Sequence, residues 1–275
     1  MFDQFDPAED KMLQVIDNNG KVISKELMPK LSDDEMLKLY KDMLFVRTLD
    51  HMIVSYQRQG RVYTYPPNYG QEAIGVAAGA VLRHEDWLVP AFREMGAWLA
   101  KGVTMKEIFM FNMGFEEGMR FTEANHVLPF SVPIASQLLH GAGIGYAIKY
   151  QKKDEVAMAF VGDGGTSEGD FHEALNFAGV WKVPVIFVVQ NNQYAISVPV
   201  KMQTASVNIA IKSKAYGIKG IKVDGNDIFA MLTAFRYAHE FARKEQQAVL
   251  IEAVTYRKGA HTTSDDPTKY RTTEE

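Results

Sequence analysis

The chain has 275 residues, of which 47% are hydrophobic and 23% charged, and its formal net charge is −4 at pH 7. This composition is typical of a globular protein with a sizeable core, and the slightly acidic charge argues against a nucleic-acid or membrane-surface role. The absence of cysteine excludes disulfides, thiolate nucleophiles and zinc–thiolate sites, and it fits the reducing cytoplasm, where we expect the protein to work.

The first part of the chain is predicted to be an arm followed by helices. Residues 1–31 show no periodicity and are expected to form an irregular arm, whereas residues 32–275 are expected to form one domain. Ser32 followed by Glu35 has the spacing of a capping box and predicts the start of a long helix that ends near Gly60. The apolar residues at helical spacing within it are Leu37, Tyr40, Leu44, Met52 and Tyr56. Further helices are predicted at 71–83, 105–114 and 137–150, with a short strand leading into a loop over 86–96.

From residue 156 onward, apolar strands alternate with helical segments. Strands are predicted at 156–161, 183–190, 218–223 and 248–256. Helices are predicted between them at 169–182, 205–217 and 226–244, and residues 257–275 are expected to form a polar loop. Strands that are apolar throughout and separated by helices predict an α/β fold in which helices cover both faces of a parallel sheet.

A glycine-rich segment, VGDGGTSEGDFHEA (161–174), follows the first of these strands. Because ligands of an open parallel sheet bind at the carboxyl ends of its strands, Asp163 is predicted to lie at that edge. The glycines do not keep the G-x-G-x-x-G spacing of a dinucleotide loop, and no Gly-Lys-Ser/Thr follows them, so the segment does not resemble a nucleotide loop. Taken alone, it is equally compatible with an ordinary glycine turn.

The next strand ends with a pair of asparagines, Asn191 and Asn192. Two neighbouring parallel strands would place Asp163 and Asn192 side by side at the carboxyl edge of the sheet. A carboxylate, an amide oxygen and a backbone carbonyl are hard ligands suited to Mg²⁺ or Ca²⁺, and Mg²⁺ takes much of its coordination shell from substrate phosphates. The pair therefore predicts a metal ion that holds a diphosphate.

The spacing of these residues resembles the thiamine diphosphate motif, in which Gly162-Asp163-Gly164 is followed after 27 residues (165–191) by Asn192. The neighbouring sequence is similar to one family, the thiamine-dependent alpha subunits of 2-oxo acid dehydrogenase complexes. The similar stretches are NYGQEA (68–73), FREMG (92–96), VDGND (223–227), LIEAVTYR (250–257) and HTTSDDPTKYRT (261–272). The resemblance covers about residues 30–275 and implies the thiamine diphosphate-binding fold with a helical N-terminal part; the further C-terminal helices usual in the family are absent from this sequence.

The resemblance implies a set of cofactor ligands. The magnesium ligands of the family fall on Asp163, Asn192 and the main-chain oxygen of Tyr194. Gly164 and Gly165 would lie against the diphosphate of thiamine diphosphate.

Further cofactor contacts are implied outside this motif. Where relatives usually carry Tyr-Arg, this chain has Phe92-Arg93, so the arginine remains to bind the diphosphate while the hydroxyl is missing. Ile134 matches an apolar residue beside the cofactor. His261 matches the histidine of the active-site loop and is expected to bind the diphosphate or to position the reacting groups; histidine can also move protons near neutral pH.

Four more positions are interpreted through the resemblance. Tyr270 and Arg271 match a pair that orders the active-site loop, and Thr262 aligns with a serine that is phosphorylated in mitochondrial relatives. Glu117 stands where bacterial pyruvate enzymes often carry a histidine, a departure from the family pattern.

The activity implied by the resemblance is oxidative decarboxylation of a 2-oxo acid, with transfer of the acyl group to a lipoyl group on the acyltransferase core. In this family a separate beta subunit carries the glutamate that activates the cofactor ring, so we expect an α2β2 heterotetramer and half an active site in this chain. Pyruvate is the expected substrate. A branched-chain 2-oxo acid or acetoin dehydrogenase subunit is the alternative, and a non-catalytic assembly subunit is another.

The remaining histidines are expected to be structural. His140 and His172 lie on predicted helices near the proposed site and are expected to pack behind it. His84, His126 and His239 show no partner pattern and are expected to be exposed to solvent.

Overall fold

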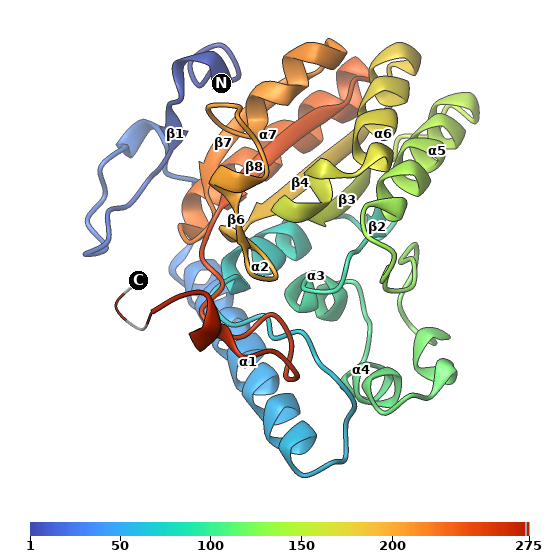
Figure 1. Ribbon diagram of the computed structural model, residues 1–275. Helices are drawn as coiled ribbons and strands as arrows, with labels where there is room; N and C mark the ends of the chain where they lie inside the picture. Colours follow the sequence, from blue (N-terminus) through green and yellow to red (C-terminus); the bar gives the residue numbers. More distant parts are fainter. Residues whose placement is uncertain (273, 275) are drawn as a thin grey trace.

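A computed structural model describes residues 1–272 and 274, and its centre is a six-stranded parallel sheet with the strand order β1-β7-β8-β4-β3-β2 (Figure 1). The strands of this sheet are β1 (Met12–Leu13), β2 (Trp87–Val89), β3 (Ala157–Gly162), β4 (Val185–Asn191), β7 (Lys219–Asp224) and β8 (Val249–Val254). A separate antiparallel hairpin is formed by β5 (Tyr194–Ala195) and β6 (Val198–Pro199). The prediction of a parallel α/β sheet is confirmed.

Seven α-helices surround the sheet in the described part of the chain. They are α1 (Asp33–Arg58), α2 (Glu72–Val81), α3 (Met95–Ala100), α4 (Met105–Asn112), α5 (Ser136–Tyr150), α6 (Gly169–Trp181) and α7 (Ile228–Glu245). The predicted capping box opens α1, since Glu35 N donates to Ser32 Oγ at 3.2 Å and Ser32 N donates to Glu35 Oε2 at 2.7 Å. Within the described residues, no helix combines the length and the apolar character that crossing a membrane requires.

Each face of the sheet carries its own hydrophobic core. Successive side chains of a strand point to opposite faces, so Met158 and Phe160 of β3 join one core while Ala157 and Ala159 join the other. The first core includes residues of α1, α2, α3 and α7, and the second includes residues of α5 and α6. Helices therefore cover both faces, as predicted.

Two segments differ from the sequence prediction. Helix α3 begins at the end of the segment expected to be a loop and continues into residues for which nothing was predicted. It packs so closely on α2 that a Cβ added at Gly96 would lie 2.7 Å from Val76 N. A six-residue helix of this kind is stabilised by packing rather than by its own propensity, which explains why no periodicity predicts it. The helix predicted at 205–217 is a shorter 3₁₀ turn, η6 (Ala210–Tyr216).

The N-terminal arm is held against the domain. It supplies strand β1 at the edge of the sheet, paired with β7. The buried carboxylate of Asp227 accepts hydrogen bonds from Val15 N at 2.7 Å and Ile16 N at 2.8 Å. Its other oxygen caps α7 by accepting from Phe229 N and Ala230 N at 3.0 Å each. One side chain therefore joins the arm to the start of α7.

Helix α1 has two apolar faces. The side chains of Leu39, Val46 and Ile53 are buried in the core. Most of the periodic apolar residues noted in the sequence lie on the outer side instead: the exposed ones are Leu37, Tyr40, Leu44 and Met52, at 44–60% exposure.

The expectation that His239 is exposed is wrong. This histidine is 8% exposed, and its Nε2 lies 2.8 Å from the buried carboxylate of Asp86. His126 is half-buried and its ring stacks on Trp87 at a centroid distance of 4.3 Å. Both contacts join elements that are distant in sequence.

Candidate active site

Four neighbouring strands end at one edge of the sheet, and a polar residue follows each of them. Arg93 follows β2, Asp163 follows β3, Asn192 follows β4 and Arg257 follows β8. Because these strands are parallel and adjacent in the order β8-β4-β3-β2, their carboxyl ends bring the four residues to the same edge. Of the four, only Arg257 was not predicted as a site residue.

A cavity of about 230 Å³ lies at this edge, and the residues predicted from the sequence all line it. They are Phe92, Arg93, Ile134, Asp163, Gly164, Gly165, Asn192, Tyr194 and His261. They come from five separate stretches of the chain, so the fold, rather than nearness in sequence, brings them together.

Asp163 and Asn192 lie next to each other, as the strand ends require. The carboxylate of Asp163 accepts hydrogen bonds from Asn192 N at 3.3 Å and from Gln203 Nε2 at 2.9 Å. The Asn192 side chain donates through Nδ2 to Gln71 Oε1 at 3.2 Å and accepts at Oδ1 from Tyr194 N at 3.4 Å. Burial raises the pKa of the Asp163 carboxyl, so this group gains from a nearby positive charge.

The oxygens of this cluster fit a magnesium ion. Asp163 offers a carboxylate oxygen, Asn192 an amide oxygen and Tyr194 a backbone oxygen, and all three residues line the cavity. In the described residues no group of three or more His, Cys, Asp or Glu side chains gathers to hold a metal. Of the residues that the structure describes, only two carboxylates line the cavity, those of Asp163 and Glu168, and a site with so few suits Mg²⁺ when phosphates and water complete its shell.

The glycine turn after β3 is required by packing. Gly164 and Gly165 lie in a 3₁₀ turn, η4 (Asp163–Ser167), and neither has a positive φ. A Cβ added at Gly164 would lie 2.5 Å from Ala195 Cβ, and one at Gly165 would lie 2.3 Å from Val161 Cγ2. Only glycine lets this backbone lie so close to both neighbours, and the backbone then lines the cavity directly.

A buried arginine forms one wall of the cavity. Arg93 is 7% exposed and donates through Nε to Pro67 O at 3.0 Å. Its terminal nitrogen donates to His261 O and lies 3.4 Å from His261 Nδ1. Burial and the charge of Arg257 lower the pKa of Arg93 to about 10, so the guanidinium remains cationic at pH 7.

Arg257 is a second buried cation. Its guanidinium donates to Tyr194 O at 2.9 Å and to Ile196 O at 2.6 Å, while its buried Nε finds no acceptor among the described residues. Arg257 does not line the cavity, but its charge lies close enough to lower the pKa of Arg93, and two neighbouring buried cations favour an anion such as a diphosphate in the cavity.

His261 is neutral in this environment. Burial and the charges of Arg93 and Arg257 lower the pKa of its imidazole to about 4. Because a guanidinium can only donate, the contact from Arg93 makes Nδ1 an acceptor, which leaves the proton on Nε2. A neutral ring with an Nε2–H group can donate a hydrogen bond to a bound anion.

The loop that carries His261 is held by the two residues expected to order it. Arg271 donates to the backbone oxygens of Lys258 at 3.2 Å and Gly259 at 2.6 Å. The hydroxyl of Tyr270 accepts from Arg257 at 2.9 Å.

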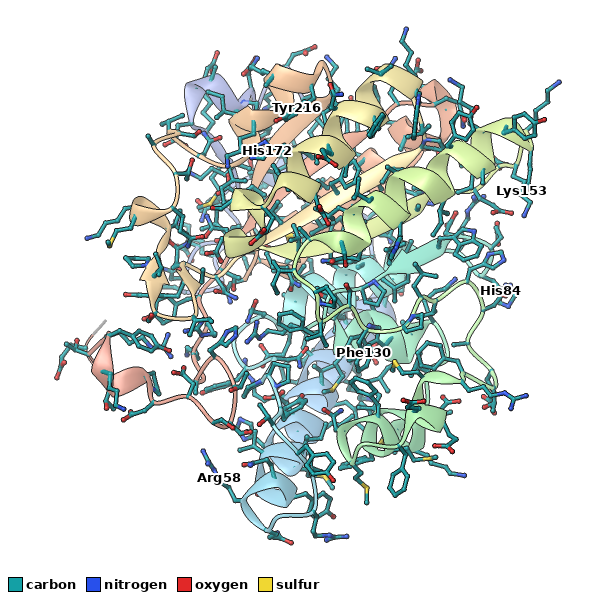
Figure 2. All side chains as sticks on the ribbon, turned by 45° about the vertical axis from the view of Figure 1, so that its right-hand side comes forward. Arg58, His84, Phe130, Lys153, His172 and Tyr216 are labelled. Atoms are coloured by element: carbon teal, nitrogen blue, oxygen red, sulfur yellow. The ribbon has the colours of Figure 1, made fainter. Side chains whose placement is uncertain are left out.

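Other candidates lie away from the cavity. Glu117 is exposed in the short 3₁₀ turn η3 (Glu116–Met119). His140 is exposed, so the expectation that it packs behind the site is wrong. His172 is half-buried, and its Nδ1 lies 2.5 Å from Tyr216 Oη on η6 (Figure 2). It also hydrogen-bonds the backbone of Thr166 in the η4 turn, although it does not line the cavity.

Sequence reasoning missed three charged residues in or beside the site. Glu168 lines the cavity, and Arg257 and Glu94 hydrogen-bond residues that line it. Arg257 carried a usable signal, because it follows the end of an apolar strand by three residues. Glu94 carried none: it is fully buried beside Arg93, accepts from Arg93 N at 3.1 Å and from Gln190 Nε2, and its burial raises its pKa to about 7.

Comparison with known proteins gives one family. Residues 40–275 match the family described as Dehydrogenase E1 component. The chain is 45% identical over 260 residues to the pyruvate dehydrogenase E1 component subunit alpha of Acholeplasma laidlawii, covering 94% of this chain and 75% of that protein. It is 41% identical over 266 residues to the protein of the same name from Staphylococcus aureus strain Mu50, covering 96% and 72%. It is also 48% identical over 246 residues to the 3-methyl-2-oxobutanoate dehydrogenase subunit alpha of Mycobacterium tuberculosis, covering 89% and 67%.

Proposed function

This chain belongs to the dehydrogenase E1 component family, and from that premise we propose that it is the alpha subunit of a pyruvate dehydrogenase that binds thiamine diphosphate and Mg²⁺. The observation that carries the proposal is the single cavity at which Asp163, Asn192, Arg93 and His261 meet. It occurs in a chain that is 41–45% identical to subunits of that name.

The proposal gives most of the polar groups predicted from the sequence a part in binding. Asp163, Asn192 and the backbone oxygen of Tyr194 would hold the magnesium ion. Arg93 would bind the diphosphate, and the charge of Arg257 would favour the same anion. Their burial supports this assignment, because a buried cation gains more from an anionic ligand than an exposed one does.

Thiamine diphosphate, when bound, supplies the electron sink that allows a 2-oxo acid to lose carbon dioxide. The residues of this chain bind the anionic end of that cofactor and keep it oriented. His261 would donate from Nε2 to an anionic oxygen, since its Nδ1 already accepts from Arg93. Ile134 and Ile196 add apolar side chains to the cavity wall.

We also propose the partners of this chain. The relatives are named as alpha subunits of an E1 component, which supports assembly with a beta subunit, and we propose an α2β2 heterotetramer. The acyl acceptor would be a lipoyl domain of the acyltransferase component.

A branched-chain substrate is the second candidate, because of the 48% identity to a 3-methyl-2-oxobutanoate dehydrogenase subunit. Comparison of kcat/KM for pyruvate and 3-methyl-2-oxobutanoate in the reconstituted complex separates the two. We expect pyruvate to be preferred, and a preference for the branched acid would reassign the substrate.

Cofactor binding is tested by calorimetry on the complex of this chain with its beta subunit. We expect thiamine diphosphate to bind only when Mg²⁺ is present, and Asp163→Ala to abolish that binding. The matched control is Asp86→Asn, which alters an equally buried carboxylate outside the cavity. Complex formation without any cofactor binding would instead identify a non-catalytic assembly subunit.

A further inference from the structure

Residues 65–68 form hydrogen bonds that hold Arg93 and the residues after it. The Pro67 oxygen accepts from Arg93 Nε at 3.0 Å, and Asn68 Oδ1 accepts from Met95 N at 3.3 Å. One backbone oxygen and one side-chain oxygen of this short segment therefore fix both the guanidinium of Arg93 and the start of the helix that follows it.

The same segment also holds the loop that carries His261. Thr263 N donates to Tyr65 O at 2.9 Å, and Tyr65 N donates to Thr263 Oγ1 at 3.0 Å. Arg58, near the end of α1, adds a hydrogen bond to Thr263 O at 3.1 Å. Figure 1 shows this C-terminal loop alongside α1, and Figure 2 labels Arg58 at the end of that helix.

The segment has no regular structure that could fix its own position. Residues 63–68 belong to neither a helix nor a strand, and two of them are prolines, which have no N–H group. The remaining N–H groups in residues 65–68 belong to Tyr65 and Asn68. Thr263 accepts from the first, and the side chain of Asp50 accepts from the second at 2.7 Å.

Asp50 is a buried acidic residue on α1, and all of its side-chain hydrogen bonds are to Tyr65 and Asn68. It is 1% exposed, and its Oδ1 accepts from Tyr65 Oη at 2.6 Å as well as from Asn68 N. Asn68 Nδ2 closes the cluster by donating to Tyr65 Oη at 3.1 Å. The other oxygen, Oδ2, has no partner among the described residues. A buried carboxyl with one unpaired oxygen is costly. We therefore attribute its place on α1 to the hydrogen bonds that it accepts from residues 65–68.

We propose that Asp50 is a positioning residue for the anion site, acting through residues 65–68 on both Arg93 and the His261 loop. The identity of the anion as a diphosphate rests on the proposed function. A small displacement of Pro67 would move the guanidinium of Arg93, and such displacements are costly in sites that depend on orientation.

The test compares Asp50→Ala with Asp50→Asn in the complex with the beta subunit. Asp50→Ala removes the acceptor from Tyr65 and Asn68, and we expect the dissociation constant of magnesium thiamine diphosphate to rise about tenfold or more. Asp50→Asn keeps an acceptor at Oδ1 and is expected to restore most of the affinity. The control Asp86→Asn alters a residue that precedes β2 and accepts from Val156 N at the amino end of β3, away from the cavity. It is expected to lower the melting temperature and leave the affinity unchanged.

Hydrogen exchange of the cofactor-free protein gives a second readout. Asp50→Ala is expected to speed exchange of the amides in 63–68 and 260–264, whereas Asp86→Asn leaves them protected. If Asp50→Ala does not fold, Tyr65→Phe replaces it, since this change removes one of the same hydrogen bonds and keeps the carboxylate.

A double-mutant cycle with Arg93→Ala distinguishes an effect of Asp50 on the position of Arg93 from a general loss of folding stability. If Asp50 acts through Arg93, its substitution costs much less affinity in the Arg93→Ala background. Unchanged affinity and exchange in Asp50→Ala, or full additivity with Arg93→Ala, would overturn the proposal. Wild-type protein that binds no cofactor would refute the proposed function instead, and the exchange data alone would then decide the role of Asp50.

Discussion

Glu94 provides a prediction about stability that follows from its burial beside the cavity. Its carboxyl is fully buried, and this raises its pKa from an ordinary value of 4.5 to about 7. The folded protein therefore binds this proton more tightly than the unfolded chain does. The resulting stabilisation is complete below pH 4.5 and is lost as the pH rises to about 7. The difference between the two pKa values corresponds to about 3 kcal/mol.

Glu94→Gln removes this titration and keeps the shape of the side chain. The new amide oxygen can accept from Arg93 N, and the new amide nitrogen can donate to Gln190 Oε1, which is buried without a partner in the described structure. The variant should therefore resemble the protonated wild type at every pH. We expect it to be more stable than the wild type by less than about 1 kcal/mol at pH 5 and by up to about 3 kcal/mol at pH 8.

Urea unfolding at pH 5, 6, 7 and 8, followed by tryptophan fluorescence, measures this difference. Glu240→Gln is the control, because that carboxyl is exposed and its substitution should not produce a stability gain that grows between pH 5 and 8. A Glu94→Gln variant whose stability difference is the same at pH 5 and pH 8 would refute the reasoning, as would one that is less stable at pH 8.

Three further predictions concern other positions. Phe92→Tyr restores a hydroxyl at the cavity wall, and we expect thiamine diphosphate to bind about three- to tenfold more tightly in calorimetry; unchanged affinity would show that the hydroxyl finds no partner. Ile196 has a φ of 54° between β5 and β6, so Ile196→Gly should stabilise the protein by about 1 kcal/mol and raise the melting temperature by about 2–4 °C, whereas Ser197→Gly should not. Asp227→Ala removes the acceptor shared by the arm and α7, and faster hydrogen exchange at residues 12–16 should accompany a loss of about 2 kcal/mol or more in urea unfolding; an arm that stays protected would contradict this role.

Asp163 and Asn192 could be predicted because their positions follow from local patterns, whereas Phe92, Arg93, Ile134 and His261 were predicted only through the family resemblance. A strand such as β3 is apolar throughout, and the first carboxylate after it must lie at the carboxyl edge of the sheet. The same argument places Asn192 after β4. Since β3 and β4 are neighbours, no tertiary information beyond strand adjacency was needed to bring Asp163 and Asn192 together.

Elements stabilised by distant partners could not be predicted in this way. Helix α3 depends on the close approach of Gly96 to α2, and strand β1 depends on pairing with β7 more than 200 residues later. His239 is buried because it pairs with Asp86, and nothing in the sequence around either residue indicates that contact.

The periodicity of α1 shows a different limit of sequence reasoning. A hydrophobic pattern predicts that a helix forms, but the apolar residues of α1 occupy more than one face of the helix. The face with Leu37, Tyr40 and Leu44 fits the helical period as well as the buried face does, so the pattern alone does not decide which side packs on the core.

Positioning residues are hidden from the sequence for a related reason. Asp163 and His261 belong to motifs whose chemistry can be recognised, whereas Asp50 is one of five acidic residues on α1 and belongs to no such motif. Its role becomes visible only when Asn68 and Tyr65 are seen to donate to one buried oxygen. The sequence therefore predicts the atoms that would touch the cofactor better than the atoms that hold them in place, although both sets are buried and both determine how well the anion is bound.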